Sequence, residues 1–509
     1  MHHGDTETPR HRDTETQRHR DTETPRRPIT SFFSQLLIQW SIANAGTASN
    51  LSVPPCLRGE LPQEKRIMKA HAISVIRTLR QAGYPAYLVG GCVRDVLLGR
   101  EPEDYDVTTQ ATPDQVMGLF PETYAVGAQF GVVLVPSPDK SFTVEVATFR
   151  SDGGYSDGRR PDSVRYSQDA KEDVQRRDFT INGLLLDPLN DDPITEQVLD
   201  YVGGRNDMEA RILRTIGEPA QRFHEDKLRL LRAVRFAARL DYEIDPTTFA
   251  AIRQLAPQIH QVSRERVADE LTKMLTEGRA RRAFELLDAT ALLPEVLPEI
   301  AAMKGVAQPP QYHPEGDVWT HTLLLLENLP QPCSRTQAWG ALLHDVGKPP
   351  TFRVAPDRIR FDGHVEVGVK MAAEICRRLR FSNADTEQIL ALIQQHMRFG
   401  DIQRMKQSTL KKFLRLPKIE EHIEQHRLDC LASHRDLTLY DFARQKLTAT
   451  APEIMRPAPL LTGVDLIAHG YAPGPRFKEI LDAVEDAQLE GRLQSREQAL
   501  AWAQREFPL

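Results

Sequence analysis

The spacing of hydrophobic and polar residues divides the chain into three regions. The repeat at the start of the chain is nearly free of apolar residues, and the first helical pattern opens at Met68. From there to residue 216, short runs rich in β-branched residues alternate with helical segments, whereas beyond Gly217 apolar residues recur with a period of 3.6. The pattern therefore predicts an α/β region followed by an almost wholly helical one. The clearest predicted strands are 86–91, 104–109, 131–136 and 142–149.

Proline-rich stretches at 308–314 and 451–459 predict two joints within the helical region. Together with the change of pattern near residue 217, they predict a chain of several domains, which a length of 509 residues also requires. The expected segments are a leader 1–67, an α/β head 68–216, a helical neck 217–307, a second helical domain 308–440 and a helical tail 441–509.

The leader opens with three copies of an eight-residue repeat, DTETPRHR, DTETQRHR and DTETPRRP. A segment so polar and charged cannot bury a core, and we expect it to be disordered. Residues 26–48 have some features of a signal peptide, but glutamine and serine interrupt the apolar part and a charged stretch precedes it. We therefore expect a cytoplasmic protein.

The composition of the chain favours some classes of protein and excludes others. Hydrophobic residues make up 40% and charged residues 27% of the chain, as in soluble globular proteins, and no apolar run is long enough to cross a bilayer. The formal net charge of -6 excludes a generally basic nucleic-acid coat, so any RNA binding must come from local clusters of arginine and lysine. The five scattered cysteines have no zinc-site spacing and are typical of reduced thiols in the cytosol.

A double glycine followed by two carboxylates is the first candidate site. A predicted strand leads into Gly90-Gly91, and the helix after it carries Arg94. Glycine permits close backbone approach to a phosphate, and a helix N-terminus offers free N–H groups. Asp104 and Asp106 follow, two residues apart on a predicted strand, so both carboxylates should face one side, where they suit Mg²⁺ carrying a triphosphate. Glu145 is either a third carboxylate for this metal or a solvated strand residue.

These residues resemble the signature of the class II CCA-adding enzyme and bacterial poly(A) polymerase family. The pattern GGxVRDxLLGRxxxDxDxxT occupies residues 90–109, and three further blocks follow in the family's order at 176–187, 225–240 and 264–275. The resemblance implies an α+β fold: a nucleotidyltransferase α/β head with a small mixed sheet, then a helical neck, an HD-type helical domain and a helical tail. It also implies addition or repair of the 3′-CCA end of tRNA from CTP and ATP, without a nucleic-acid template.

The family motifs assign roles residue by residue. Gly91 and Arg94 should contact the phosphates or sugar of the nucleotide, Asp104 and Asp106 should bind catalytic Mg²⁺, and Arg177 should bind nucleotide. Gly183 departs from the family, which usually has alanine there, and we expect no effect on chemistry.

Asp226 and Arg229 are the candidates for base selection. Their three-residue spacing in a helical block predicts that both lie on one face. Cytosine and adenine each present an amino donor beside a ring-nitrogen acceptor, which a carboxylate and a guanidinium complement, whereas uracil and guanine present the opposite order. The family assigns the same role to these positions. Arg232 and Arg235 continue the row and are either a solvated basic stripe or, as the resemblance favours, contacts to nucleotide or RNA phosphate.

The segment from residue 313 resembles an HD-type phosphohydrolase domain through HPEGDVWTH, ALLHDVGKP, FDGH and HRLDC. The resemblance makes His321, His344, Asp345 and Asp429 the ligands of a divalent metal, and His364 and His396 could extend the site to a second ion. Imidazole and carboxylate ligands suit Ni²⁺, Mn²⁺, Fe²⁺ or Mg²⁺. His313 and His426 are expected on the surface.

The expected partners are tRNA, CTP and ATP, with no membrane and no DNA. The tail resembles the tRNA-holding tail of HD-bearing family members. The alternatives are a poly(A) polymerase, an enzyme adding only C or only A, a phosphohydrolase whose head merely binds nucleotide, and a non-catalytic RNA-binding protein. Intact Asp104, Asp106, Asp226 and Arg229 argue against the last two.

Overall fold

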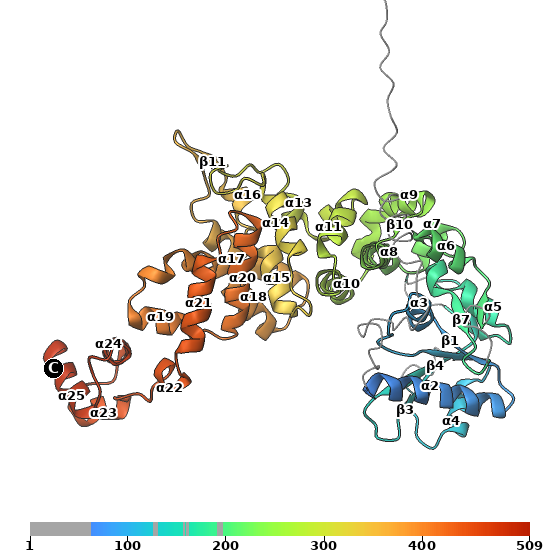
Figure 1. Ribbon diagram of the computed structural model, residues 1–509, viewed down its shortest axis with the longest axis horizontal. Helices are drawn as coiled ribbons and strands as arrows, with labels where there is room; N and C mark the ends of the chain where they lie inside the picture. Colours follow the sequence, from blue (N-terminus) through green and yellow to red (C-terminus); the bar gives the residue numbers. More distant parts are fainter. Residues whose placement is uncertain (1–62, 126–130, 156–157, 159–161, 191–196) are drawn as a thin grey trace, which may run out of the picture. The chain divides into compact units, whose positions relative to one another are not determined.

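The computed structural model describes residues 63–125, 131–155, 158, 162–190 and 197–509 (Figure 1). The repeat leader and the segment 26–48 lie outside these residues. Within the described chain, no helix has the length and apolar character needed to span a membrane.

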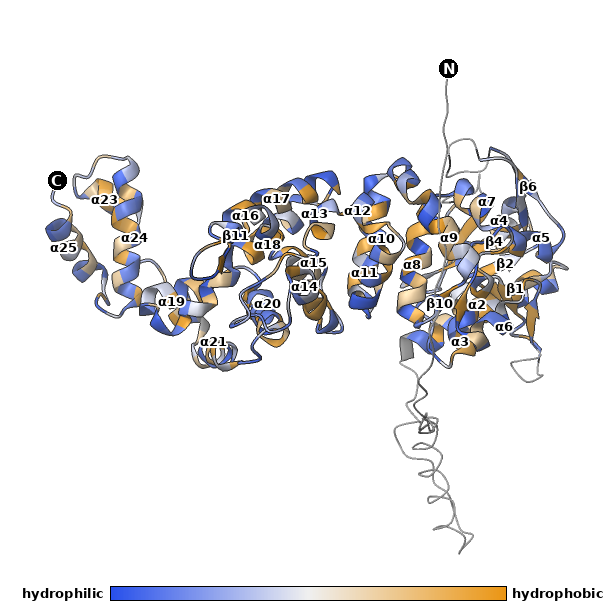
Figure 2. Ribbon diagram, turned by 90° about the horizontal axis from the view of Figure 1, so that it is seen from above, coloured by the Kyte–Doolittle hydropathy of each residue, from blue (hydrophilic) through white to orange (hydrophobic). Residues whose placement is uncertain are grey.

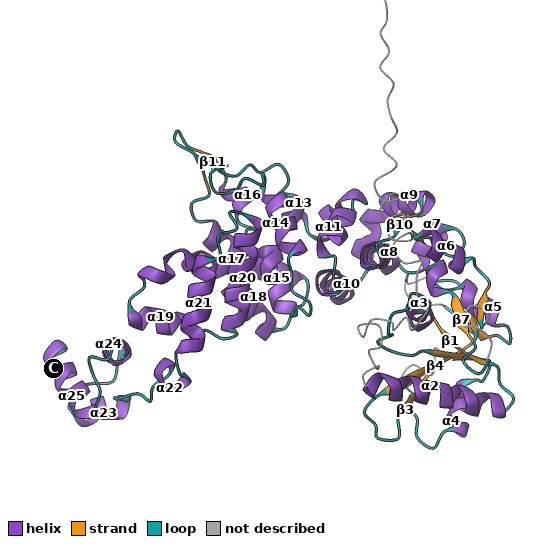
Figure 3. Ribbon diagram, viewed as in Figure 1, coloured by secondary structure: helices purple, strands orange, loops and turns teal. Residues whose placement is uncertain are grey.

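The head contains a six-stranded sheet in the order β3-β4-β2-β1-β7-β8 (Figure 3). β2 runs parallel to β4, and the other neighbouring strands are antiparallel, so the expected small mixed sheet is confirmed. Its strands are β1 (Ala86–Val89), β2 (Val107–Thr109), β3 (Val132–Pro136), β4 (Thr143–Thr148), β7 (Leu184–Leu186) and β8 (Val198–Asp200). Around it lie α2 (Gln63–Gln81), α3 (Gly91–Leu97), α4 (Pro113–Leu119), α5 (Ala170–Gln175), η3 (Thr180–Asn182), α6 (Gly204–Ala210) and the hairpin of β5 (Arg150–Asp152) and β6 (Val164–Tyr166).

Two predicted boundaries in the head are wrong. The first helix begins at Gln63 rather than at Met68. The strand predicted from residue 104 begins only at Val107, so Asp104 and Asp106 lie in the segment before it. The reason is the partner strand: β1 ends at Val89, and Gly90 turns the chain away with a φ of 80°. The regular pairing between the two strands therefore stops at Leu88 and Val107.

The neck is helical as predicted, apart from a short parallel pair of β9 (Ile212–Leu213) and β10 (Glu243–Ile244). Its longest helices, α8 and α10, pack against each other, and α11 packs on α8. The ribbons of these helices carry both hydrophobic and hydrophilic stretches (Figure 2). The neck helices are α7 (Pro219–Glu225), α8 (Leu228–Leu240), α9 (Pro246–Leu255), η4 (Ala256–Gln261), α10 (Arg264–Thr276), α11 (Ala280–Ala289), α12 (Leu293–Val296) and α13 (Pro298–Ala301).

The remaining chain is a helical domain and a tail. The helical domain comprises α14 (Val318–Glu327), α15 (Arg335–Leu343), α16 (Lys348–Thr351), the hairpin of β11 (Arg353–Val354) and β12 (Ile359–Arg360), α17 (His364–Arg378), α18 (Asn383–Gln395), η5 (His396–Arg404), α19 (Gln407–Leu414), α20 (Ile419–Ala432) and α21 (Thr438–Ala449). The last of these runs across the expected boundary at residue 440. The tail consists of α22 (Pro452–Met455), α23 (Gly463–Ala468), α24 (Pro475–Leu489) and α25 (Arg496–Glu506). Its last three helices share a separate hydrophobic core.

Gly183 lies where a larger side chain would collide with its neighbours. A methyl group built on it would lie 2.9 Å from Val202, 3.0 Å from Ile216 and 3.1 Å from Val174. Its φ of -96° is open to any residue, so the restriction is one of packing rather than of backbone conformation. The departure from alanine at this position therefore matches the packing around it.

We expect Gly183→Ala to destabilise the protein by about 1–3 kcal/mol through overpacking, without abolishing folding. Differential scanning calorimetry would show a lower midpoint for the transition that includes the head. Gly118→Ala is the matched control, because this glycine lies within α4 and nothing is found within 4 Å of a methyl group built there. Equal midpoints for the two variants would contradict the packing argument.

Candidate active sites

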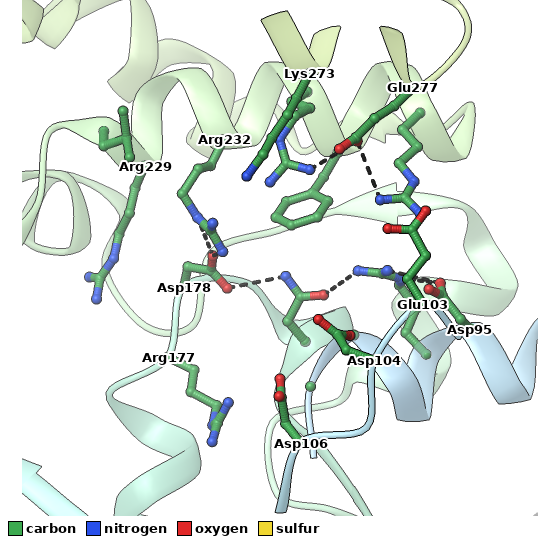
Figure 4. Close-up of a pocket in the computed structure, with 18 of the residues that line it drawn as sticks. Asp95, Glu103, Asp104, Asp106, Arg177, Asp178, Arg229, Arg232, Lys273 and Glu277 are labelled. Carbon is green, nitrogen blue, oxygen red and sulfur yellow. Dashed lines mark hydrogen bonds and ion pairs between the residues drawn. The ribbon is translucent and has the colours of Figure 1, made fainter. Parts of the chain in front are cut away.

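A cavity of about 580 Å³ lies between the head and the neck (Figure 4). α3, the segment before β2 and the 176–182 segment of the head line one side, and α8 and α10 of the neck line the other. The structure brings together all the residues that the sequence proposed for the nucleotide site, and their roles remain predictions. They are Gly91, Arg94, Asp104, Asp106, Arg177, Asp226, Arg229, Arg232 and Arg235.

The double glycine forms the turn between β1 and α3, as the sequence predicts. Gly90 adopts a left-handed φ of 80°, and α3 begins at Gly91, so the first backbone N–H groups of this helix lie at the cavity. Arg94, one turn later, is almost fully buried and donates to Asn182 Oδ1 at 2.7 Å. This end of the cavity has the glycine turn, free helix N–H groups and guanidinium that a phosphate requires.

Asp104 and Asp106 both line the cavity, on either side of the buried Tyr105. Burial, followed by the charges of Asp104 and Glu145, raises the pKa of Asp106 to about 7. The pKa of Glu145, on β4, is also raised by desolvation and by Asp104. Three neighbouring carboxylates, of which Asp106 and Glu145 have raised pKa values, are a donor set that a divalent cation would stabilise.

Asp226 does not lie on one helical face with Arg229, so that prediction is wrong. α7 ends at Glu225, and Asp226 is extended, with a φ of -149°. Its Oδ1 accepts a hydrogen bond from the backbone N–H of Leu228 at 3.0 Å. Aspartate commonly makes such side-chain bonds to backbone N–H groups at a helix start, which interrupts the helical run. Both side chains nevertheless line the same cavity.

In this structure the two proposed base-selecting side chains contact other groups. Asp226 accepts from both terminal nitrogens of Arg266, at 2.6 and 3.2 Å. Arg229 lies 2.5 Å from Glu225 and donates to the carbonyl of Arg176 at 3.2 Å. Glu225 and Arg266 thus fix the directions of these side chains.

Arg232 and Arg235 are not a solvated basic stripe. Arg232 donates to Asp178 Oδ2 at 2.6 and 2.9 Å, and the pKa of Asp178, although raised by burial, is lowered to about 2 by Arg232. Arg235 is buried and lies 2.6 Å from Glu270 of α10. Both arginines line the cavity and are each paired with a carboxylate, Arg232 with Asp178 of the same cavity and Arg235 with Glu270.

The sequence analysis missed several residues of this cavity. The most informative are Asp178, Asn182 and Arg266, all within blocks quoted for their family resemblance. No local pattern distinguishes them from other polar residues, because each has a partner that lies 40 or more residues away in the chain.

The six residues proposed for the HD metal site also come together. The Nε2 atoms of the histidines surround two carboxylates, with His321 at 3.1 Å from Asp429 and His344 at 3.1 Å from Asp345. Nε2 of His364 and His396 lies 3.8 and 3.9 Å from Asp345. The potential ligand atoms of His321, His344 and Asp429 lie within 4.8 Å of one another, as do those of Asp345, His364 and His396.

These groups fit a divalent metal. The Nε2 atoms of His321, His344 and His364 are buried and make no well-formed hydrogen bond to any described residue. Although burial lowers it, the carboxylates of Asp429 and Glu315 beside the ring raise the pKa of His321 to about 9. Imidazole and carboxylate ligands of this kind suit first-row transition metals.

A second cavity, of about 550 Å³, opens onto this cluster. Lys348 lies at its inner end, 2.7 Å from Asp345, and the ring of Tyr312 lies at its exposed rim. The β11–β12 hairpin contributes Arg358 and Arg360. A space that joins a potential metal cluster to several cationic side chains suits a phosphoester.

The two histidines expected on the surface are not exposed. His426 is buried in α20 and stacks on Phe399 with ring centroids 4.6 Å apart. His313 is partly buried and bonds to Glu315 at 2.8 Å. Their sequence surroundings show a turn and a polar helix, and only the tertiary packing covers them.

Comparisons with known proteins agree with this arrangement. Three family models match the chain: the poly A polymerase head domain over residues 86–214, the probable RNA and SrmB-binding site of polymerase A over residues 241–304, and the HD domain over residues 317–432. Among solved structures, the crystal structure of the Bacillus stearothermophilus CCA-adding enzyme in complex with CTP is similar with a TM-score of 0.66 and 28% identity. That similarity covers 86% of this chain and 97% of the other.

Curated relatives of the chain are also named CCA-adding enzymes. The CCA-adding enzyme of Geobacillus stearothermophilus is 40% identical over 276 residues, which are 54% of this chain and 63% of the relative, so the match spans slightly less than two thirds of its length. The CCA-adding enzyme of Geobacillus sp. (strain WCH70) is 32% identical over 435 residues, which are 84% of this chain and 95% of the relative. The chain therefore belongs to the CCA-adding enzyme family, with a poly(A) polymerase-type head and an HD domain.

Proposed function

We propose that the protein is a tRNA nucleotidyltransferase that adds or repairs the 3′-CCA end of tRNA with CTP and ATP, without a nucleic-acid template. The observation that supports this most strongly is the cavity between head and neck. It combines a pair of carboxylates, Asp104 and Asp106, with a second pair made of one carboxylate and one guanidinium, Asp226 and Arg229. The first pair suits nucleotidyl transfer and the second suits recognition of a base.

Different groups of the chain bind the triphosphate, the sugar and the metal ion. The N–H groups at Gly91 and the side chains of Arg94 and Arg177 bind the triphosphate and sugar, while Arg232 and Arg235 add positive potential behind them. Asp104 and Asp106 would bind Mg²⁺, which when present would neutralise the triphosphate and favour ionisation of the attacking 3′-hydroxyl.

Base selection follows from the hydrogen-bonding edge of the incoming nucleotide. Asp226 accepts from the amino group of cytosine or adenine, and Arg229 donates to the adjacent ring nitrogen. Uracil or guanine would oppose acceptor to acceptor and donor to donor, a mismatch that a buried site rejects strongly. For Asp226 to bind the base, one of its oxygens must remain available beside Arg266, which fixes the carboxylate from α10.

The test is incubation of a tRNA lacking CCA with Mg²⁺ and labelled CTP, ATP or both. The proposal expects a product ending in CCA with both nucleotides and no further extension. Long tails from ATP alone would identify a poly(A) polymerase, and incorporation of only one nucleotide would identify a C-adding or A-adding enzyme. We also expect a cytoplasmic location, where tRNA is available.

The HD cluster supports a second activity, a metal-dependent phosphohydrolase. The observation in its favour is the convergence of four imidazoles and two carboxylates at one end of a cavity with cationic walls. A bound divalent metal would supply an activated water for phosphoester hydrolysis.

Asp104→Ala and Asp106→Ala should each abolish nucleotide addition while the protein stays folded, because each removes an oxygen ligand for Mg²⁺. Incorporation of labelled CTP and ATP measures the effect, and thermal unfolding checks the fold. Asp114→Ala, an exposed aspartate of α4 away from the cavity, is the matched control. Activity within a few-fold of wild type in either cavity variant would refute the metal assignment.

Arg229→Ala should lower CTP and ATP incorporation sharply and reduce discrimination against UTP and GTP by about one to two powers of ten. The reason is that a mispaired polar edge in a buried site costs about 1–3 kcal/mol. Relative rates for all four triphosphates on one truncated tRNA provide the measurement. Arg177→Ala is the comparison, since loss of a phosphate contact should weaken all four nucleotides equally; the same result for Arg229→Ala would overturn its role in base selection.

The double variant His344→Ala, Asp345→Ala should lose hydrolysis of small phosphoesters such as 2′,3′-cyclic nucleotides and keep CCA addition. The reason is that these two residues belong to the HD cluster and do not line the nucleotide cavity. Both reactions are assayed on the same preparations. Simultaneous loss of both activities would show that the sites are not independent.

A further inference from the structure

The four histidines of the HD cluster are oriented in two different ways. In His344, His364 and His396, Nδ1 lies 2.7–2.9 Å from the backbone carbonyl three residues earlier, in Ala341, Phe361 and Ile393. Each of these bonds directs Nε2 toward the carboxylates and leaves the ring with a neutral acceptor behind it. His321 is the exception, because its Nδ1 lies 2.7 Å from a carboxylate oxygen, Oε1 of Glu315.

Glu315 occupies a turn immediately before α14. Asp317 caps this helix by accepting from the N–H of Thr320 at 2.8 Å, and His321 follows in its first turn. The carboxylate of Glu315 thereby lies behind the His321 ring, with its side chain only 7% exposed. The same oxygen also accepts from Nδ1 of His313, at 2.8 Å. A buried carboxylate with two imidazole donors on one oxygen cannot leave this position without losing both bonds.

We propose that Glu315 is a positioning residue for the metal site of the HD domain. It fixes the tautomer of His321 with the proton on Nδ1, directs Nε2 between Asp345 and Asp429, and makes this imidazole the strongest nitrogen donor of the four. A carboxylate behind a metal-binding histidine increases the basicity of the ring, which a backbone carbonyl does far less. This inference rests on the proposed metal-dependent function of the cluster.

A different arrangement of the same residues is a metal held directly by His313, Glu315 and His321, whose potential ligand atoms also lie within 4.8 Å of one another. The distances favour the positioning role. Both imidazoles already make short hydrogen bonds to a single oxygen of Glu315, and the free nitrogen of His321 is directed to the opposite side, 3.1 Å from Asp429. The two arrangements predict different effects of removing His313.

The test is titration of the metal-free full chain with Ni²⁺ by calorimetry, with the His344→Ala, Asp345→Ala variant as the background for binding elsewhere. The wild type should bind Ni²⁺ above this background. Glu315→Ala should weaken that binding 10- to 100-fold, the range found when such carboxylates are removed. Glu315→Gln should give an intermediate loss, because its amide oxygen still accepts from Nδ1 but carries no charge. His313→Ala should change the affinity by no more than a few-fold.

Each outcome that contradicts the proposal gives a different pattern of Ni²⁺ affinities. No Ni²⁺ binding by the wild type above the background would refute the proposed HD metal site itself. Wild-type binding with an unchanged affinity in both Glu315 variants would overturn the role of Glu315 alone. A loss in His313→Ala as large as in Glu315→Ala would show that the three residues ligate the ion directly. Unimpaired CCA addition and an unchanged melting temperature of the metal-free protein establish that Glu315→Ala is folded. If that variant does not fold, Glu315→Gln is used in its place. Equal Ni²⁺ affinity of Glu315→Gln and the wild type then overturns the proposal.

Discussion

The nucleotide cavity depends on one continuous line of hydrogen bonds that joins the head to the neck. Arg94 of α3 donates to Asn182, and Asn182 donates to Asp178. Asp178 in turn accepts from Arg232 of α8 (Figure 4). Asp178 and Asn182 are buried, so removing one member would leave an uncompensated polar group or charge and destabilise the junction of head and neck. The same bonds that set the two walls of the cavity therefore also direct Arg94 and Arg232 into it.

Charge is distributed within that cavity in two opposite ways. At the head, burial and the charge of Asp104 raise the pKa values of Asp106 and Glu145, which leaves a negative site suited to a cation. Along the neck, guanidinium groups are balanced by acidic residues behind them, as in the contact of Arg235 with Glu270. A nucleoside triphosphate with its metal ion combines both requirements, since it brings a divalent cation and several anionic oxygens together. The acidic net charge of the chain conceals this local arrangement.

In the HD cluster, too, hydrogen bonds from groups outside the site orient the potential ligands. Three of its histidines are directed by the backbone carbonyls three residues earlier, and the fourth by a carboxylate from the turn before α14. In each case the group behind the ring determines which nitrogen faces the centre. The positions of these second groups, rather than the histidines alone, give the site its geometry.

The sequence by itself determined the order of the head, neck and HD domain, four strands of the head, the helical character of the rest and which motif residues lie together at each of the two cavities. Periodicity and motif spacing are local properties of the sequence, so they can be read without knowing how the helices and strands pack. Only the tertiary structure decided that Asp104 and Asp106 precede their strand, that Asp226 lies between two helices, and that His426 is buried. It alone also identified Arg266 as the partner of Asp226, 40 residues apart in the chain. Pairing across such distances depends on how helices and strands pack, which no local pattern encodes, whereas Glu315 and His321 lie only six residues apart and could have been found from the turn that joins them.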